Sequence, residues 1–276
     1  MKFRVISDLH IDVNHRHPFQ LKEMDNDITT LVAGDVSGDP SLDYEWLQNN
    51  TNLKGYVVSG NHIVYNDKDK TVSELQDLEK ELFTKSNRWQ YLEKDYKILE
   101  NEKIIIFGAT LWTDYLYNGE EVFNMWSAKL ALNDFRFGMV ENSDGERVEL
   151  FPKWCKDEHI ATLEKLDKVC KDYPDYSVIV LTHHCPSGQS VMPKYANYNT
   201  NAAFVSDLTK FIEDHKNIKA WICGHVHTPH SYEVGDCMVI ANPMGYTHYG
   251  ENTGWDMDTM NFELKDGKVV FEKENK

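Results

Sequence analysis

The sequence predicts an α/β fold that contains a parallel β-sheet. Three short stretches of apolar, often β-branched residues recur at intervals of about 26 residues, and each ends in polar residues typical of a loop. They comprise residues 2–7, 28–33 and 55–59. Residues 42–50, between the second and third stretches, fit a short helix. This alternation is typical of βαβ units, in which helices join successive parallel strands.

The rest of the chain continues to alternate helices and strands. Residues 71–83 carry apolar side chains at three- and four-residue spacing, which predicts an amphipathic helix. A longer helix is expected to begin at Pro152 and to end before Pro174. Residues 136–151 show no clear period and predict an exposed loop. We expect further helices at 120–134 and 202–215, and strands at 96–99, 103–109, 177–182, 219–223, 231–234, 237–241, 260–264 and 269–273.

Length and composition favour one domain over residues 1–276. A chain of 276 residues could form one large or two small domains, but no repeat, low-complexity tract or linker divides it. No apolar run approaches the roughly 18 to 20 residues of a membrane span, and the first residues lead into a strand rather than a signal peptide. We therefore expect a cytoplasmic protein with no membrane partner; the oligomeric state is open.

The chain is acidic, with 29 lysines and arginines against 45 aspartates and glutamates and a net charge of −16. Such a surface repels long nucleic acids unless a basic groove overrides it, whereas small ligands are less affected. The five cysteines are widely spaced and include no C-x-x-C pair. This pattern argues against a disulfide framework and against a zinc ribbon.

Five predicted strands end in clusters of side chains that are able to bind metal ions. The clusters are Asp8-Leu9-His10, Gly34-Asp35, Gly60-Asn61-His62, His183-His184 and Gly224-His225-Val226-His227. Each one alone is compatible with an ordinary turn. In an open α/β sheet, however, ligands bind outside the carboxyl ends of the strands, so the five clusters are able to converge. Their joint occurrence predicts a metal site.

The residue types indicate which chemistry this site would support. Imidazole together with oxygen ligands suits Mn, Fe, Zn or Ni, and a bridging carboxylate is able to hold two cations about 3.5 to 4 Å apart. Such a centre binds phosphate oxygens and lowers the pKa of bound water, which generates a nucleophile. Phosphoester hydrolysis is the predicted reaction.

The ordered set of clusters, which spans residues 8–227, resembles the signature of the calcineurin-like metallophosphoesterase family. The resemblance implies a four-layer αββα sandwich, in which two mixed β-sheets are flanked by helices and a dimetal site lies at the carboxyl ends of the strands. It implies two divalent metal ions, with Mn favoured. The implied ligands are Asp8, His10, Asp35 and His227 for one ion, and Asp35, Asn61, His183 and His225 for the other, with Asp35 bridging.

The resemblance also implies a mechanism. In such enzymes a hydroxide that bridges the metal ions attacks phosphorus, and His62 would protonate the leaving group or position the phosphate. Two positions depart from the family pattern. Ile63 stands where an acidic residue usually follows Gly-Asn-His, and Gly38 stands where Asn or Asp often follows the bridging aspartate by three residues. The proton-transfer partner of His62 is therefore open.

Three further residues are weaker candidates for contact with substrate. His184 adjoins a predicted ligand and would hydrogen-bond behind it rather than bind metal. Arg136 could reach a substrate phosphate or form a structural salt bridge. Asn199 lies in the stretch 186–201, which would form either a substrate-facing lid or a surface or subunit-contact loop. His15 and His17 lie just past the first cluster and could line the mouth of the site, but exposure to solvent is the favoured expectation.

The leading hypothesis is a dinuclear phosphoesterase that hydrolyses phosphomonoester or phosphodiester bonds of a small phosphorylated substrate. One alternative is a scaffold with this fold that binds partners and has lost catalysis, but every ligand position and His62 are present. Another is a phosphoprotein phosphatase, which would need an extended basic groove. The lysines and arginines near the motifs are only scattered.

Overall fold

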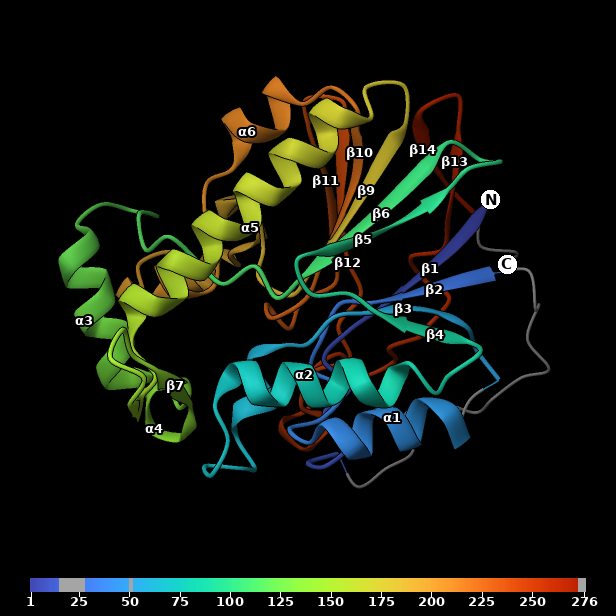
Figure 1. The fold of residues 1–276 in the computed structure, drawn as a ribbon. Coiled ribbons are helices and arrows are strands. Elements are labelled where there is room, and N and C mark those ends of the chain that lie inside the picture. Colours follow the sequence, from blue (N-terminus) through green and yellow to red (C-terminus); the bar gives the residue numbers. More distant parts are fainter. Residues whose placement is uncertain (15–27, 50–51, 273–276) are drawn as a thin grey trace.

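The computed structural model describes residues 1–14, 28–49 and 52–272, so the predictions for His15 and His17 lie outside the described residues. Two mixed six-stranded sheets stack on each other (Figure 1). The first has the strand order β14-β13-β1-β2-β3-β4 and the second β11-β12-β10-β9-β6-β5. The bounds in the first sheet are β1 Lys2–Ile6, β2 Ile28–Val32, β3 Gly55–Val57, β4 Trp89–Tyr91, β13 Phe262–Lys265 and β14 Lys268–Phe271. Those in the second are β5 Asp95–Leu99, β6 Ile104–Ala109, β9 Ser177–Thr182, β10 Ile218–Cys223, β11 His230–Val234 and β12 Cys237–Ala241.

Helices cover the outer face of each sheet, which completes the four-layer αββα sandwich implied by the resemblance (Figure 1). α1 (Pro40–Asn49) and α2 (Val72–Phe83) lie against the first sheet. α5 (Pro152–Asp172) and α6 (Thr209–Asp214) lie against the second. Thr71 and Glu74 form a capping box that fixes the start of α2.

The strands alternate their side chains between two apolar cores. In β6, Ile104 and Ile106 point into the core between the sheets, together with Leu31 of β2. Ile105 and Phe107 point to the opposite side, into the core under α5 and α6. This period of two is expected for strands that are buried on both faces.

Two predictions for the middle of the chain were wrong. The range 136–151 is not a loop throughout, because it begins in a helical turn and then forms a hairpin of strands β7 (Met139–Glu141) and β8 (Arg147–Glu149). Each of these strands has three residues, which are too few to show the alternation of apolar and polar side chains that predicts a strand. The expected helix at 202–215 is broken, because Val205 pairs with Cys185 and only α6 remains helical after it. The sequence reasoning also missed β4, whose three residues pair with β3.

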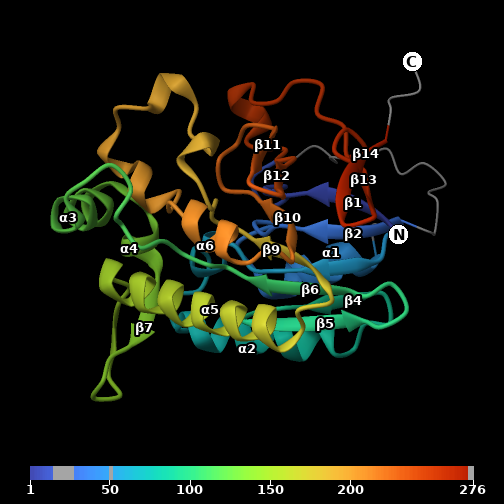
Figure 2. The same ribbon diagram turned by 90° about the horizontal axis from the view of Figure 1, so that it is seen from above.

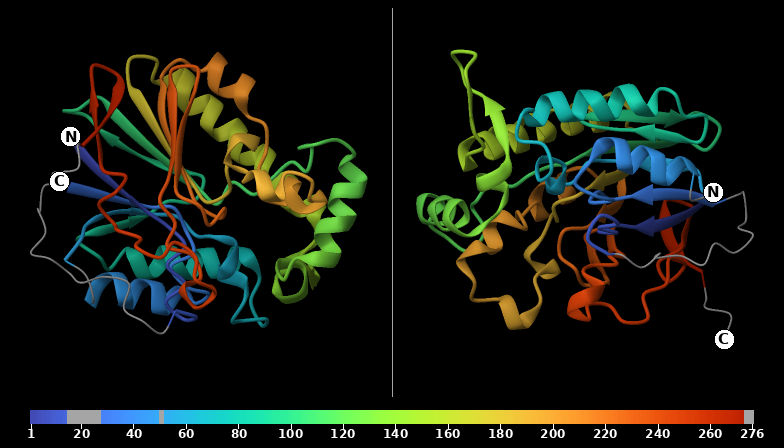
Figure 3. Two further views of the ribbon diagram at one scale, coloured as in Figure 1. Left: turned by 180° about the vertical axis from the view of Figure 1, so that it is seen from behind. Right: turned by 90° about the horizontal axis from the view of Figure 1, so that it is seen from below.

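Two further helices lie at one end of the sandwich. They are α3 (Glu121–Ala131) and α4 (Asp134–Phe137), which Figure 2 shows beside β7 and away from the two sheets. Short 3₁₀ turns connect other elements: η1 Asn61–Val64, η2 Gly188–Ser190, η3 Pro193–Tyr195, η4 Asn199–Ala203 and η5 Thr247–Tyr249. Figures 2 and 3 show that the gold segment around η3 and the red segment around η5 project on the same side of the molecule.

Candidate metal centre

The structure gathers the seven predicted metal ligands and His62 at one edge of the two sheets. Asp8 and His10 follow β1, Asp35 follows β2, Asn61 and His62 begin η1 after β3, His183 follows β9, and His225 and His227 follow β10. Four of these residues adopt a left-handed backbone: Asp8, His10, Asp35 and His225, with φ of 52°, 43°, 52° and 61°. Non-glycine residues adopt this conformation uncommonly, although Asp and His tolerate it better than most, and a group of such residues is typical of functional sites.

A first group consists of Asp8, His10 and His227, whose nitrogen and oxygen ligand atoms lie within 4.8 Å of one another. Nε2 of His227 lies 3.1 Å from Nε2 of His10 and 3.3 Å from Oδ1 of Asp8. The backbone N–H of His225 donates to both oxygens of Asp8, at 3.0 and 3.2 Å, which fixes this carboxylate. Two imidazole nitrogens that face each other beside a carboxylate are a donor set suited to a divalent cation.

A second group surrounds His183. Its Nε2 lies 2.9 Å from Oδ1 of Asn61, 3.1 Å from Nδ1 of His225 and 3.3 Å from Oδ2 of Asp35. The opposite ring nitrogen, Nδ1, lies 2.8 Å from the carbonyl oxygen of Ala33, which orients the ring. One ring nitrogen carries at most one hydrogen and cannot satisfy three polar neighbours, whereas a cation among them would contact all four donors.

Asp35 lies between the two groups. It shares one set of mutually close ligand atoms with His183 and His225, and another with His10 and His62. His10 faces this centre with Nε2 and His225 with Nδ1, the ring nitrogens that lie beside other candidate ligand atoms. A carboxylate placed between two such groups suits contact with two cations.

The charges of the site are balanced by protons that metal ions would replace. Burial opposes protonation of His183, but the nearby Asp35 carboxylate outweighs it and raises the pKa of His183 to about 9. Burial likewise opposes protonation of His227, yet hydrogen bonds to Asp8 and Glu251 raise its pKa to about 10. In contrast, burial lowers the pKa of His10 to about 3, so this imidazole is neutral and available as a ligand.

Asn61 is oriented by two residues that the sequence reasoning missed. The amide nitrogen of Asn61 donates to the hydroxyl of Tyr65 at 3.4 Å, and this hydroxyl donates to Oδ2 of Asp134 at 3.1 Å. The arrangement turns the amide oxygen of Asn61 toward His183. Asp134 is buried two residues before Arg136, the neighbouring residue that the sequence suggested as a contact for substrate.

His227 is held by another residue that no motif indicated. Oε2 of Glu251 lies 2.7 Å from Nδ1 of His227 and accepts a 2.7 Å hydrogen bond from the backbone N–H of Tyr246. A carboxylate behind a metal-ligating histidine fixes the ring and its tautomer. Glu251 lies 24 residues from His227, and no local pattern links the two positions.

His62 is held by aromatic neighbours instead of the acidic residue common in the family. Its ring packs against those of Tyr65 and His10, with centroids 4.1 and 4.5 Å away. Its Nε2 lies 3.1 Å from the hydroxyl oxygen of Tyr246 and 3.8 Å from Oδ2 of Asp35. Ile63 is buried in an apolar cluster. Tyr246 therefore occupies the hydrogen-bonding position that the sequence left open.

A cavity of about 730 Å³ opens above the centre, and its lining includes Asp35, Asn61, His62, His225 and His227. None of the three weaker candidates is among the described residues that line it. His184 is buried behind His225, 4.4 Å between ring centroids, with Nδ1 3.2 Å from the carbonyl oxygen of Thr110. Arg136 is exposed and donates to Leu130 and Asn133, and Asn199 is exposed at the start of η4.

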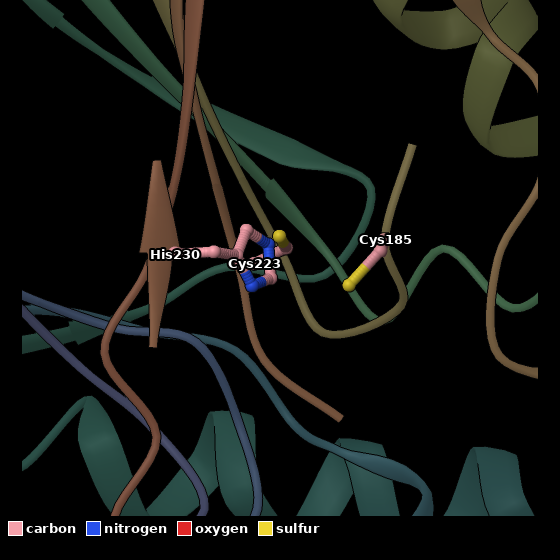
Figure 4. A group of neighbouring side chains, drawn as sticks. All are labelled: Cys185, Cys223 and His230. Carbon is pink, nitrogen blue, oxygen red and sulfur yellow. The ribbon is translucent and has the colours of Figure 1, made fainter. Parts of the chain in front are cut away.

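A separate cluster of Cys185, Cys223 and His230 also brings metal-capable atoms within 4.8 Å (Figure 4). Most of these atoms already have hydrogen-bond partners. Sγ of Cys185 donates to the carbonyl oxygen of Gly224 at 3.1 Å. The ring nitrogens of His230 lie 2.7 Å from the carbonyl oxygen of Thr228 and 3.1 Å from Oγ of Ser190. Burial raises the pKa of Cys223 well above its usual value, so the cluster fits a packing role.

No helix in the described ranges combines the length and the apolar character that a membrane crossing requires.

The two stacked sheets, with Asp, His and Asn side chains converging at their carboxyl edge, define an α/β protein with a candidate dinuclear metal centre. The chain belongs to the calcineurin-like phosphoesterase family, whose sequence profile matches residues 1–229. An uncharacterised protein of Acanthamoeba polyphaga mimivirus is 26% identical over 275 residues, which cover 90% of this chain and 92% of that protein.

A solved structure, the phosphopantetheinyl hydrolase of Mycobacterium tuberculosis, superposes with a TM-score of 0.70 at 15% identity. The match covers 100% of this chain and 97% of that one. At this identity the similarity shows the fold alone. Membership of the family supports a phosphoesterase, hence a hydrolase, that uses divalent metal ions.

Proposed function

We propose that this protein is a dinuclear metal-dependent phosphoesterase that hydrolyses monoester or diester bonds of small phosphorylated molecules. The position of Asp35 between the two groups of potential ligands carries the proposal. One ion would be held by Asp8, His10, Asp35 and His227, and the other by Asp35, Asn61, His183 and His225. When bound, two divalent ions would neutralise phosphate oxygens and activate water. The oxygen and imidazole donors suit Mn, Fe, Zn or Ni, of which we favour Mn.

The chain's own residues would then position the substrate and move a proton. His62 lies at the cavity wall beside Asp35, where its Nε2 would face the leaving oxygen of a phosphoester bound at the centre. We assign to His62 the delivery of a proton to that oxygen or the orientation of the phosphate. The Tyr246 hydroxyl, 3.1 Å from the same nitrogen, would orient the ring before substrate binds and would give up this contact when the nitrogen donates to the leaving oxygen.

Size and charge support a small substrate. The cavity of about 730 Å³ falls within the range of pockets that enclose small ligands. The net charge of −16 disfavours polyanions, while cations at the centre would still attract a single phosphate. A cytoplasmic location, with no membrane or nucleic-acid partner, is part of the same proposal.

The test is hydrolysis of chromogenic phosphomonoesters and phosphodiesters by protein stripped of metal and reloaded with Mn, Ni, Zn or Mg. We expect activity only after reloading, and we expect Asp35→Ala to lose both activity and both metal ions. Hydrolysis that survives chelation, or two metal ions retained by Asp35→Ala, would contradict the ligand scheme. Absence of hydrolysis by fully loaded protein would favour a non-catalytic scaffold.

A further inference from the structure

Three exposed tyrosines stand around the mouth of the cavity above the centre. Tyr195 and Tyr198 lie on the segment that contains η3, and Tyr249 lies in η5. Their exposed fractions are 43%, 60% and 75%, and all three line the cavity. The two segments project on the same side of the molecule (Figures 2 and 3). We call these three residues the aromatic rim.

The rings of the rim are supported by neighbouring rings. Tyr195 and Tyr198 pack edge to face, with centroids 5.6 Å apart and planes at 90°. The Tyr249 ring lies 4.0 Å from that of His248 and 6.0 Å from that of Tyr246. These large aromatic surfaces are exposed to water at the cavity entrance. A ligand that covers them lowers the free energy of the complex.

The surroundings of the rim indicate what kind of ligand would cover it. Thr200, Asn201 and Asn252 line the same cavity, so its wall is not a continuous apolar groove of the kind that a lipid chain would fill. Lys194 is the only lysine or arginine among the described residues that line the cavity, and its Nζ lies 4.6 Å from the Tyr195 ring centroid. One cation beside aromatic rings suits a small anionic ligand with a planar ring better than a polymer of phosphates.

We propose that the aromatic rim stacks against a planar heteroaromatic group of the substrate, so that the preferred substrates are nucleotide-like. The phosphate would lie at the metal centre and the base at the rim. This inference rests on the proposed function for its phosphate end. Tyrosine rings stack on any base because every base offers a flat π-surface, and such stacking changes affinity by about tenfold or more.

The experiment compares two probes on the metal-loaded, full-length protein by titration calorimetry. The probes are adenosine 5′-methylenephosphonate and ribose 5-methylenephosphonate, which differ only in the base. Their phosphorus–carbon bond resists hydrolysis, so binding is measured without turnover. We expect the adenosine probe to bind about tenfold or more tightly than the ribose probe.

Substitutions in the aromatic rim test whether it is the source of the preference for the adenosine probe. Tyr198→Ala and Tyr249→Ala should lose most of it, while the matched Tyr→Phe variants, which keep the rings, should retain it. Trp126→Ala is the control, since Trp126 is 59% exposed on α3 and is not among the residues that line the cavity. Equal affinity for the two probes, full preference in the alanine variants, or equal loss in the phenylalanine variants would overturn the proposal. A preference that persists in a protein without hydrolytic activity would overturn the proposed function alone.

Discussion

The carboxylate of Glu251 lies 2.7 Å from Nδ1 of His227, on the side of the ring opposite to Asp8. This contact leaves Nε2 of His227 directed at Asp8 and His10 in the candidate metal centre. A carboxylate in this position fixes the tautomer of the histidine and makes it a stronger ligand. Glu251 also accepts a hydrogen bond from the backbone N–H of Tyr246, so one side chain links a proposed metal ligand to the residue that contacts His62.

We predict that Glu251→Gln weakens metal binding by about 10- to 100-fold, because a neutral amide polarises the imidazole less than a carboxylate does. Competition with a fluorescent chelator measures the affinity. Glu233→Gln on the exposed side of β11 serves as the matched control. An unchanged affinity in Glu251→Gln would mean that His227 is oriented by Asp8 alone.

Tyr65→Phe should impair one of the two metal sites selectively. Without the hydroxyl, the amide nitrogen of Asn61 loses one hydrogen bond and Asp134 loses a donor, so the amide oxygen is held less firmly toward His183. We expect a fall of about tenfold or more in the affinity for one metal ion per chain. Elemental analysis after dialysis should find close to one tightly bound ion instead of two. Tyr176→Phe, whose hydroxyl contacts Glu100, controls for loss of a tyrosine hydroxyl elsewhere.

His62→Ala should keep both metal ions and lower turnover by about 10²- to 10⁴-fold, the range expected when a general acid is lost. The loss should be greatest for alkyl phosphoesters, whose leaving oxygen needs a proton, and smallest for nitrophenyl esters. Tyr246→Phe should show the same dependence on the leaving group with a smaller loss, since it removes only the contact with Nε2 of His62. Equal losses across leaving groups would assign His62 to phosphate positioning instead of proton transfer.

The core of the candidate site could be predicted because each potential ligand follows a strand directly in the sequence. Strand ends are recognisable from apolar runs, and parallel strands bring their carboxyl ends together. Glu251, Tyr246 and Asp134 could not be found in this way. Their contacts join segments 24, 184 and 69 residues apart, which only the tertiary structure determines.

The errors in the fold have a similar cause. The predicted helix at 202–215 included Val205, but this residue pairs with Cys185 in a β-bridge and does not continue a helix. Strand β4 has only three residues, too few to show alternation, and it exists because β3 offers it a parallel partner. The ends of the long helix α5 were predicted to within a few residues, because its several turns make the apolar period visible in the sequence.

The protein without metal should become less stable as the pH rises from about 7 to 9.5. The pKa values of His183 and His227, about 9 and about 10 in the folded state, exceed the usual value of 6.5. A proton bound more tightly in the folded state stabilises it fully below the unfolded pKa, and this stability is lost as the pH passes through the folded pKa. Burial also raises the pKa of Glu93 to about 7 and that of Glu79 to about 8, which adds a loss of the same sign.

Metal loading separates these contributions, because metal ions would displace protons from the two histidines but leave both glutamates unchanged. Melting temperatures across this pH range should therefore fall more steeply for the chelated protein than for the loaded one. Calorimetric titration with Mn²⁺ at pH 7.5 in buffers of different ionisation enthalpy should detect proton release on binding. Parallel melting curves together with binding that releases no protons would show that His183 and His227 are not the groups that a cation displaces.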